Sequence, residues 1–174
     1  MLAIMLATIT ILITSIAVYT DVRWGKIFNA LTFPALAVGL VINTIVGGGN
    51  GALLSVEGIA LGFALFIVSA IFGRILGGGD IKLLMAIGAL QGPYFLAWAI
   101  FYTALAGAVL ALGVGLYRGV LGQRVRFLFA SLYLRLNQGV PMEMNEAAGT
   151  SPRLPYAIAI GLGSLVAICV LHVF

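Results

Sequence analysis

The chain has 174 residues, of which 63% are hydrophobic and 8% are charged, and it carries a net charge of +4. With a mean hydropathy of +1.20, this composition excludes an ordinary soluble globular domain and predicts an integral membrane protein. The single cysteine, Cys169, excludes a disulfide framework and a thiolate zinc site. We expect one membrane-embedded domain over residues 1–174.

Apolar segments follow one another along the chain. A spanning helix needs about 20 residues, and most of the segments approach that length. In chain order the six predicted segments are Leu2–Tyr19, Ala30–Val46, Leu53–Phe72, Ile81–Leu90, Tyr94–Tyr117 and Leu154–Phe174. Gly47–Gly51 separates the second from the third, and Gln91-Gly92-Pro93 separates the fourth from the fifth. The sequence therefore predicts an all-α, polytopic fold with six transmembrane helices.

The fourth segment, Ile81–Leu90, is the ambiguous one. At about 1.5 Å per residue, its ten residues cover only about 15 Å of a hydrocarbon core roughly 30 Å thick. If it counts as a span, all nine lysines and arginines fall on one face, whereas fusing it with the next segment divides them between the faces. The positive-inside rule then makes that face cytoplasmic and puts both termini outside. We expect a short, broken fourth helix.

The first apolar segment lacks a basic start and a small-residue cleavage site, so we expect a retained span and not a signal peptide. The basic residues are divided among loops near the membrane and do not gather on one soluble face. Membrane orientation and anionic lipid explain this charge better than nucleic acid, which we do not expect as a partner.

The chain has two aspartates, Asp21 and Asp80, and each stands where an apolar segment meets a short polar connection. Burying a carboxylate at membrane depth is costly unless it is paired, hydrated or protonated, so such residues indicate a functional site. With six spans, both fall at the cytoplasmic edge. Two carboxylates held close together tend to share one proton, and one can act as base and the other as acid, as in aspartic proteases. The pair predicts peptide hydrolysis by an activated water, with no cofactor and no metal, on a substrate that is itself a membrane segment.

Each aspartate also has a simple structural interpretation. Asp21 could cap the second helix or offset the charges of Arg23 and Lys26. Asp80 could be the N-cap of the fourth helix. Single motifs leave these interpretations open, and the presence of both motifs favours catalysis.

Other residues near the aspartates are candidates for shaping the site. The run Gly77-Gly78-Gly79 has no side chains, so an extended substrate could lie against it. Lys82 could orient the pair, or it could extend from a helix end to the interface. Arg23 could shape the site or serve as a topology signal, and Asn29 could contact substrate or cap a helix.

Two motifs in this chain resemble those of type IV prepilin peptidases, which are GxGD aspartic proteases. They are the runs Asp21-Val22-Arg23-Trp24-Gly25-Lys26-Ile27-Phe28-Asn29 and Gly77-Gly78-Gly79-Asp80-Ile81-Lys82. Pro155-Tyr156 at the start of the last segment adds to the resemblance, which covers nearly the whole chain from Thr20 onward. Phe28 stands where the family often has proline.

The resemblance implies that Asp21 and Asp80 are the catalytic pair of an enzyme in the bacterial inner membrane. Such an enzyme cuts the leader peptide from prepilins or pseudopilins at the cytoplasmic face. Larger members carry an insert with paired CxxC motifs and also methylate the new N-terminus; without that insert here, methylation is not expected. The size is similar to that of small members from tight-adherence and Flp-type pilus systems, so we expect that branch. The expected partners are the prepilin and the lipid bilayer, and the sequence does not predict an oligomeric state.

The connection between Arg118 and Arg153 contains two further features. Gly119–Gln138 interleaves arginines with large apolar residues and predicts an amphipathic helix in the headgroup layer. Met142–Glu146 holds two glutamates that could attract a basic leader peptide.

Two other classes of function compete with a protease. In a small transporter, paired carboxylates would relay protons or bind a cation, but the spans hold few polar residues that could continue a path. A non-catalytic assembly subunit of a pilus or secretion apparatus would use the same bundle and would need neither aspartate.

Overall fold

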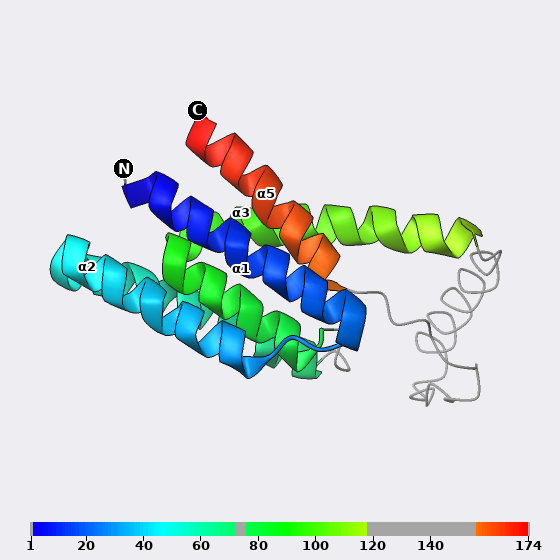
Figure 1. The fold of residues 1–174 in the computed structure, drawn as a ribbon, viewed down its shortest axis with the longest axis horizontal. Helices are drawn as coiled ribbons and strands as arrows, with labels where there is room; N and C mark the ends of the chain where they lie inside the picture. Colours follow the sequence, from blue (N-terminus) through cyan, green and yellow to red (C-terminus); the bar gives the residue numbers. More distant parts are fainter. Residues whose placement is uncertain (1, 72–75, 118–155, 174) are drawn as a thin grey trace, which may run out of the picture. The chain divides into compact units, whose positions relative to one another are not determined.

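The structure is a computed structural model that describes residues 2–71, 76–117 and 156–173. These residues form helices and contain no strand, which confirms the predicted all-α class. The helices are α1 (Leu2–Trp24), α2 (Asn29–Ile71), α3 (Gly78–Tyr117) and α5 (Tyr156–Val173) (Figure 1). The predicted interfacial helix Gly119–Gln138, the acidic stretch Met142–Glu146 and Arg74 lie outside the described residues.

The described residues up to Gly107, together with α5, belong to one compact unit. The end of α3, from Ala108 to Tyr117, belongs to a second unit and continues as a regular helix. All contacts described below lie within the first unit.

Among the described residues, three helices are long and apolar enough to cross a membrane: α1, α2, and α3 from Gly78 to Val114. Large apolar side chains on their surfaces are widely exposed, among them Ile4 at 71% and Ile45 at 78%. Exposed apolar surface of this extent favours an apolar medium, and lipid provides one. The fold is therefore that of a membrane protein.

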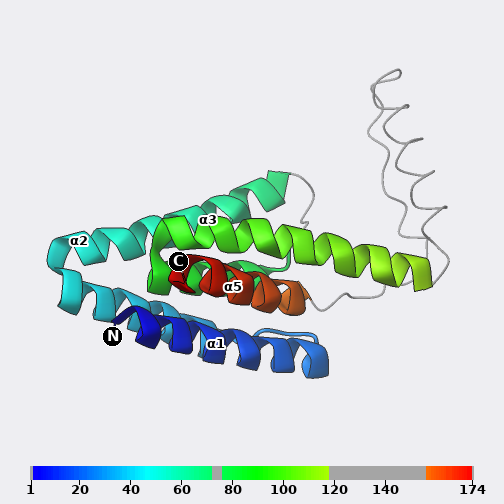
Figure 2. The same ribbon diagram turned by 90° about the horizontal axis from the view of Figure 1, so that it is seen from above.

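Two glycines interrupt the long helices where the sequence predicted breaks. Gly48 in α2 has φ +57° and Gly92 in α3 has φ +83°, values that residues with a Cβ rarely adopt. At the first break α2 turns back, and its two halves diverge from the turn (Figure 2). Close to the turn, the Asn43 amide donates a hydrogen bond of 2.9 Å to Ser55 Oγ. Both long helices are thus pairs of helical segments.

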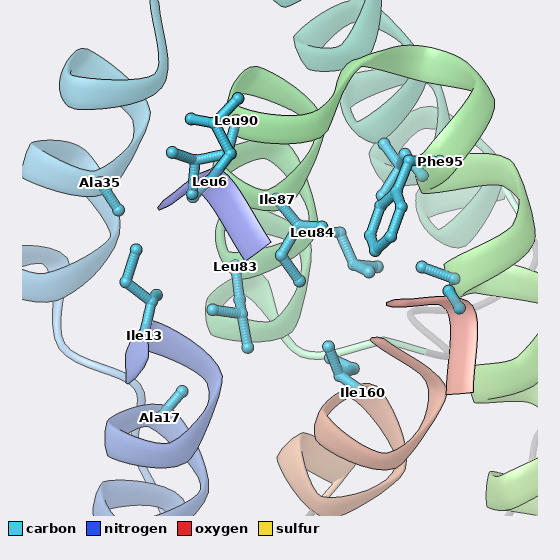
Figure 3. Close-up of a cluster of buried hydrophobic side chains, with 14 residues drawn as sticks. Leu6, Ile13, Ala17, Ala35, Leu83, Leu84, Ile87, Leu90, Phe95 and Ile160 are labelled. Carbon is cyan, nitrogen blue, oxygen red and sulfur yellow. The ribbon is translucent and has the colours of Figure 1, made fainter. Parts of the chain in front are cut away.

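The first segment of α3 forms the centre of the packed unit. Leu83, Ile87 and Leu90 from this segment are almost completely buried. Figure 3 shows them surrounded by Leu6, Ile13 and Ala17 of α1, Ala35 of α2 and Ile160 of α5. The segment that begins with Asp80 is therefore enclosed by the other helices of the unit, and they hold it in place by packing.

Close helix contact depends on glycine at one crossing. The backbones of Gly58 in α2 and Gly88 in α3 are so close that a Cβ on either residue would collide with the carbonyl group of the other. The second half of α2 therefore packs directly on the central segment.

A polar network closes the far end of the central segment. Pro93 has no N–H, so the carbonyl of Ala89, four residues earlier, lacks its helical donor. Asn43 Nδ2 donates to this carbonyl at 3.0 Å and to that of Leu90 at 3.1 Å, and Ser55 Oγ donates to Ala89 O at 2.8 Å. Side chains of α2 thus satisfy the backbone groups that the break leaves unpaired, as the interior of a membrane protein requires.

We predict that Asn43→Leu lowers the free energy of unfolding by about 1–2 kcal/mol, because the carbonyl of Leu90 loses the amide donor and that of Ala89 keeps only Ser55. Unfolding in detergent micelles, followed by circular dichroism, measures the change. The neighbouring Thr44→Ala is the control, since the exposed Thr44 hydroxyl bonds only to Leu40 O of its own helix. Equal stability of Asn43→Leu and wild type would contradict this account of the break.

Candidate active site

Asp21 lies in the last turn of α1 and is half-buried. The helix ends just after it because Gly25, with φ +64°, donates its N–H to the Asp21 carbonyl at 2.7 Å. The Asp21 carboxylate accepts a hydrogen bond of 3.3 Å from the Ala157 N–H, in the first turn of α5. The alternative that Asp21 caps the second helix is therefore wrong: its carboxylate satisfies a free N–H of the last helix.

Asp80 lies in the first turn of α3 and is also half-buried. Its carboxylate accepts a hydrogen bond from the backbone of Gly77, and the Ile81 N–H donates to Gly77 O at 3.2 Å. Asp80 is thus the third helical residue and bonds back to the N–H that precedes the helix, as the acidic member of a capping box does. The alternative that Asp80 is itself the N-cap is wrong, since Gly77 holds that position.

Gly77 and Gly79 have steric reasons to be glycine. A Cβ on Gly77 would lie 2.9 Å from Asp80 Oδ2, and one on Gly79 would lie 3.1 Å from Ile27 Cβ. Gly78 has open space around it, since a Cβ at that position would have no neighbouring atom within 4 Å. The turn therefore packs against Ile27, in the connection that follows Asp21, and keeps its middle residue clear.

The fold brings the two aspartate motifs together, because Gly79, next to Asp80, packs against Ile27 in the connection that follows Asp21. The negative charge of Asp21 acts on Asp80 across this contact. Asp80 also interacts electrostatically with the hydroxyl of Tyr156, the first residue of α5. The end of α1, the start of α3 and the start of α5 thus meet at one place.

Lys82 and Asn29, one from each aspartate motif, are in direct contact. Lys82 Nζ donates a hydrogen bond of 2.8 Å to Asn29 Oδ1, and it lies 5.4 Å from the centre of the Phe33 ring. This contact joins the start of α2 to the first turn of α3 beside the aspartates.

Among the described residues, Arg23 makes no contact with the side chain of Asp21 or Asp80. Its guanidinium lies 5.8 Å from the centre of the neighbouring Trp24 ring, and both side chains are exposed. Glu57 is exposed on the second half of α2, and Cys169 is exposed on α5.

Two residues at this place were not predicted as site residues: Tyr156 and Ala157. The sequence signal for them is the pair Pro155-Tyr156 at the start of the last apolar segment, which had no assigned role. Ala157 contributes a backbone N–H, and no side-chain pattern identifies such a group.

The arrangement suits acid–base chemistry. Both aspartates are half-buried carboxylates that accept a backbone N–H, and carboxylates are among the side chains that act as general acids and bases.

Comparison with protein families places this geometry in a known group. The model of the type IV leader peptidase family matches residues 7–112, which is more than half of the chain and includes both aspartates. Comparisons with curated proteins and with solved structures give no significant match. The predicted relationship to prepilin peptidases is thereby confirmed, and the chain belongs to the type IV leader peptidase family.

Proposed function

We propose that this peptidase is an aspartic endopeptidase that removes the leader peptide from prepilins or pseudopilins. The observation that carries the proposal is the contact between the two aspartate motifs, where Gly79 packs against Ile27 and both carboxylates are half-buried, within a chain of the leader peptidase family. Leader peptides of prepilin type are the substrate class that the family suggests.

The proposed reaction uses both aspartates and a water. The ionised carboxylate takes a proton from the water while the protonated one hydrogen-bonds the carbonyl oxygen of the scissile peptide bond. The water oxygen attacks the carbonyl carbon and forms a tetrahedral intermediate. A carboxyl proton then passes to the amide nitrogen, the carbon–nitrogen bond breaks, and the pair returns to its starting state with one shared proton.

The proposed membrane topology puts this chemistry at the cytoplasmic face of the inner membrane. The segments divided by Gly48 and Gly92 would make six spans with α1 and α5, and the positive-inside rule would put both termini outside. Asp21 and Asp80 would then be reached by water from the cytoplasm and by a substrate helix from the lipid.

The proposed roles of the neighbouring residues follow from their contacts. The Gly77-Gly78-Gly79 turn, with open space at Gly78, would accept an extended substrate backbone. Lys82 and Asn29 would hold the two motifs together, and Arg23 would lie at the headgroup layer next to Trp24.

We predict that Asp21→Asn and Asp80→Asn each lower prepilin cleavage at least about 100-fold, because either change removes one half of the acid–base pair. Cleavage of a membrane-embedded prepilin at matched expression, followed by gel shift, measures the effect. Glu57→Gln is the control, because it removes an exposed carboxylate on another helix.

Normal cleavage by either aspartate variant would reject the catalytic assignment. If the wild type cuts no cognate prepilin, a transporter or an assembly subunit becomes the better explanation for the bundle.

The contact between Lys82 and Asn29 gives a second prediction. Lys82→Ala and Asn29→Ala should each lower cleavage by about two- to tenfold, since a hydrogen bond of this kind contributes roughly 0.5–1.5 kcal/mol. The double variant should cleave no more slowly than the slower of the two single variants, because both changes remove the same bond. Lys26→Ala is the control, because Lys26 is an exposed lysine in the connection between α1 and α2. Additive losses in the double variant would show that the two side chains act separately.

A further inference from the structure

The start of α5 contacts the neighbourhood of both aspartates, although the two belong to other helices. The Ala157 N–H donates to Asp21 Oδ2 at 3.3 Å. The adjacent residue, Tyr156, interacts electrostatically with Asp80. The start of α5 is therefore joined to the end of α1 by a hydrogen bond and lies within electrostatic reach of Asp80.

The Tyr156 ring is held by α3. It is half-buried, it packs against the hydrophobic core, and its edge lies against Gly107. A Cβ on Gly107 would be 3.4 Å from the Tyr156 hydroxyl oxygen and 3.5 Å from the nearest ring carbon. The ring therefore rests close to the α3 backbone at position 107, where a Cβ would be in ordinary van der Waals contact with it.

The rest of α5 is held by α1. Gly161, about one turn further along α5, is so close to Val18 that a Cβ would lie 3.1 Å from Val18 Cγ2. The start of α5 therefore contacts α1, at Asp21 through Ala157 and at Val18 through Gly161, and it contacts the second segment of α3 at Gly107. Tyr156 also packs against the hydrophobic core that includes Leu83 and Leu84 of the first segment of α3, which carries Asp80, so it can transmit the position of α1 to that segment.

We propose that Tyr156 is a positioning residue that sets the spacing of Asp21 and Asp80. The inference rests on the proposed function for its catalytic meaning, and its structural content can be tested without catalysis. The ring keeps the start of α5 against the second segment of α3 and against the hydrophobic core, which includes the segment that carries Asp80, while the next backbone N–H holds the Asp21 carboxylate. Loss of the ring would let the two carboxylates change their separation, and a displacement of about 1 Å can cost on the order of 100-fold in rate.

Steady-state cleavage of a prepilin by Tyr156→Leu, Tyr156→Phe and wild type is the first test. We expect Tyr156→Leu to lower kcat at least about tenfold with KM within about twofold, because spacing affects the chemical step more than binding. Tyr156→Phe, which keeps the ring, should recover kcat to within about threefold of wild type. Tyr102→Leu is the matched control: Tyr102 is a half-buried tyrosine of α3 whose ring contacts Trp98 and Phe101.

Cross-linking provides a second test that needs no peptidase activity. The Val22→Cys, Gly78→Cys, Cys169→Ser protein keeps both aspartates and their backbone hydrogen bonds, and it has one thiol next to Asp21, at an exposed residue, and one in the open turn before Asp80. It is treated with a bifunctional thiol reagent, with and without Tyr156→Leu. We expect the cross-linking rate to fall at least about threefold when the ring is lost and to stay unchanged with Tyr102→Leu. Should Tyr156→Leu not yield folded protein, Tyr156→Met takes its place.

The two tests separate the two proposals. If the wild type cuts no prepilin but the cross-linking rate depends on Tyr156, the peptidase proposal fails and the spacing role stands. Equal cross-linking rates with and without the ring, or equal kcat for Tyr156→Leu and wild type, would overturn the role of Tyr156.

Discussion

The hydrogen bonds around the break at Gly92 and Pro93 constrain much of the structure. A proline there removes a backbone donor inside the apolar unit, and Asn43 and Ser55 satisfy the carbonyls left behind. The same contacts fix the first half of α2 and the second half of α2 against the central segment. Because that segment is a rigid helix, fixing its far end also determines where Asp80 lies at its near end.

Both aspartates have a structural role in addition to the proposed catalytic one. Asp21 accepts the Ala157 N–H of α5, and Asp80 accepts a backbone hydrogen bond from Gly77. Each carboxylate is therefore oriented by a helix terminus before any substrate arrives. Neither aspartate is the N-cap that the sequence suggested, but each carboxylate binds a backbone N–H at a helix terminus, and this structural role is compatible with the proposed catalytic one.

The sequence predicted the features that depend on local composition. Glycine, proline and hydropathy predicted the helix breaks at Gly48 and Gly92. They also predicted that Asp21 and Asp80 lie near helix ends. Helix limits were less accurate: the first apolar segment was predicted to end at Tyr19, whereas α1 continues to Trp24. Hydropathy decreases at the polar residues Asp21 and Arg23, but the helix stops only where Gly25 adopts a positive φ.

Tertiary contacts could not be predicted in the same way. Lys82 and Asn29 were both candidates, but their hydrogen bond joins residues 53 positions apart and depends on how the helices pack. The contribution of Ala157 is a backbone N–H, which every residue except proline has, so only the fold distinguishes it.

The crossing of Gly58 and Gly88 has a mechanical consequence. Backbone touches backbone there, and α2 also lies against the backbone of the central segment at Gly39, next to Ala89, and at Gly62, next to Met85, so a side chain at the crossing would push the segment away from α2. Asp80 lies eight residues away, about 12 Å along the helix axis, so a displacement that tilts the segment by about 5° would move its backbone by roughly 1 Å. A substitution at this crossing, in the middle of the apolar unit, would thus change the position of the Asp80 carboxylate. The placement of Asp80 relative to Asp21 therefore depends on two residues that have no side chains.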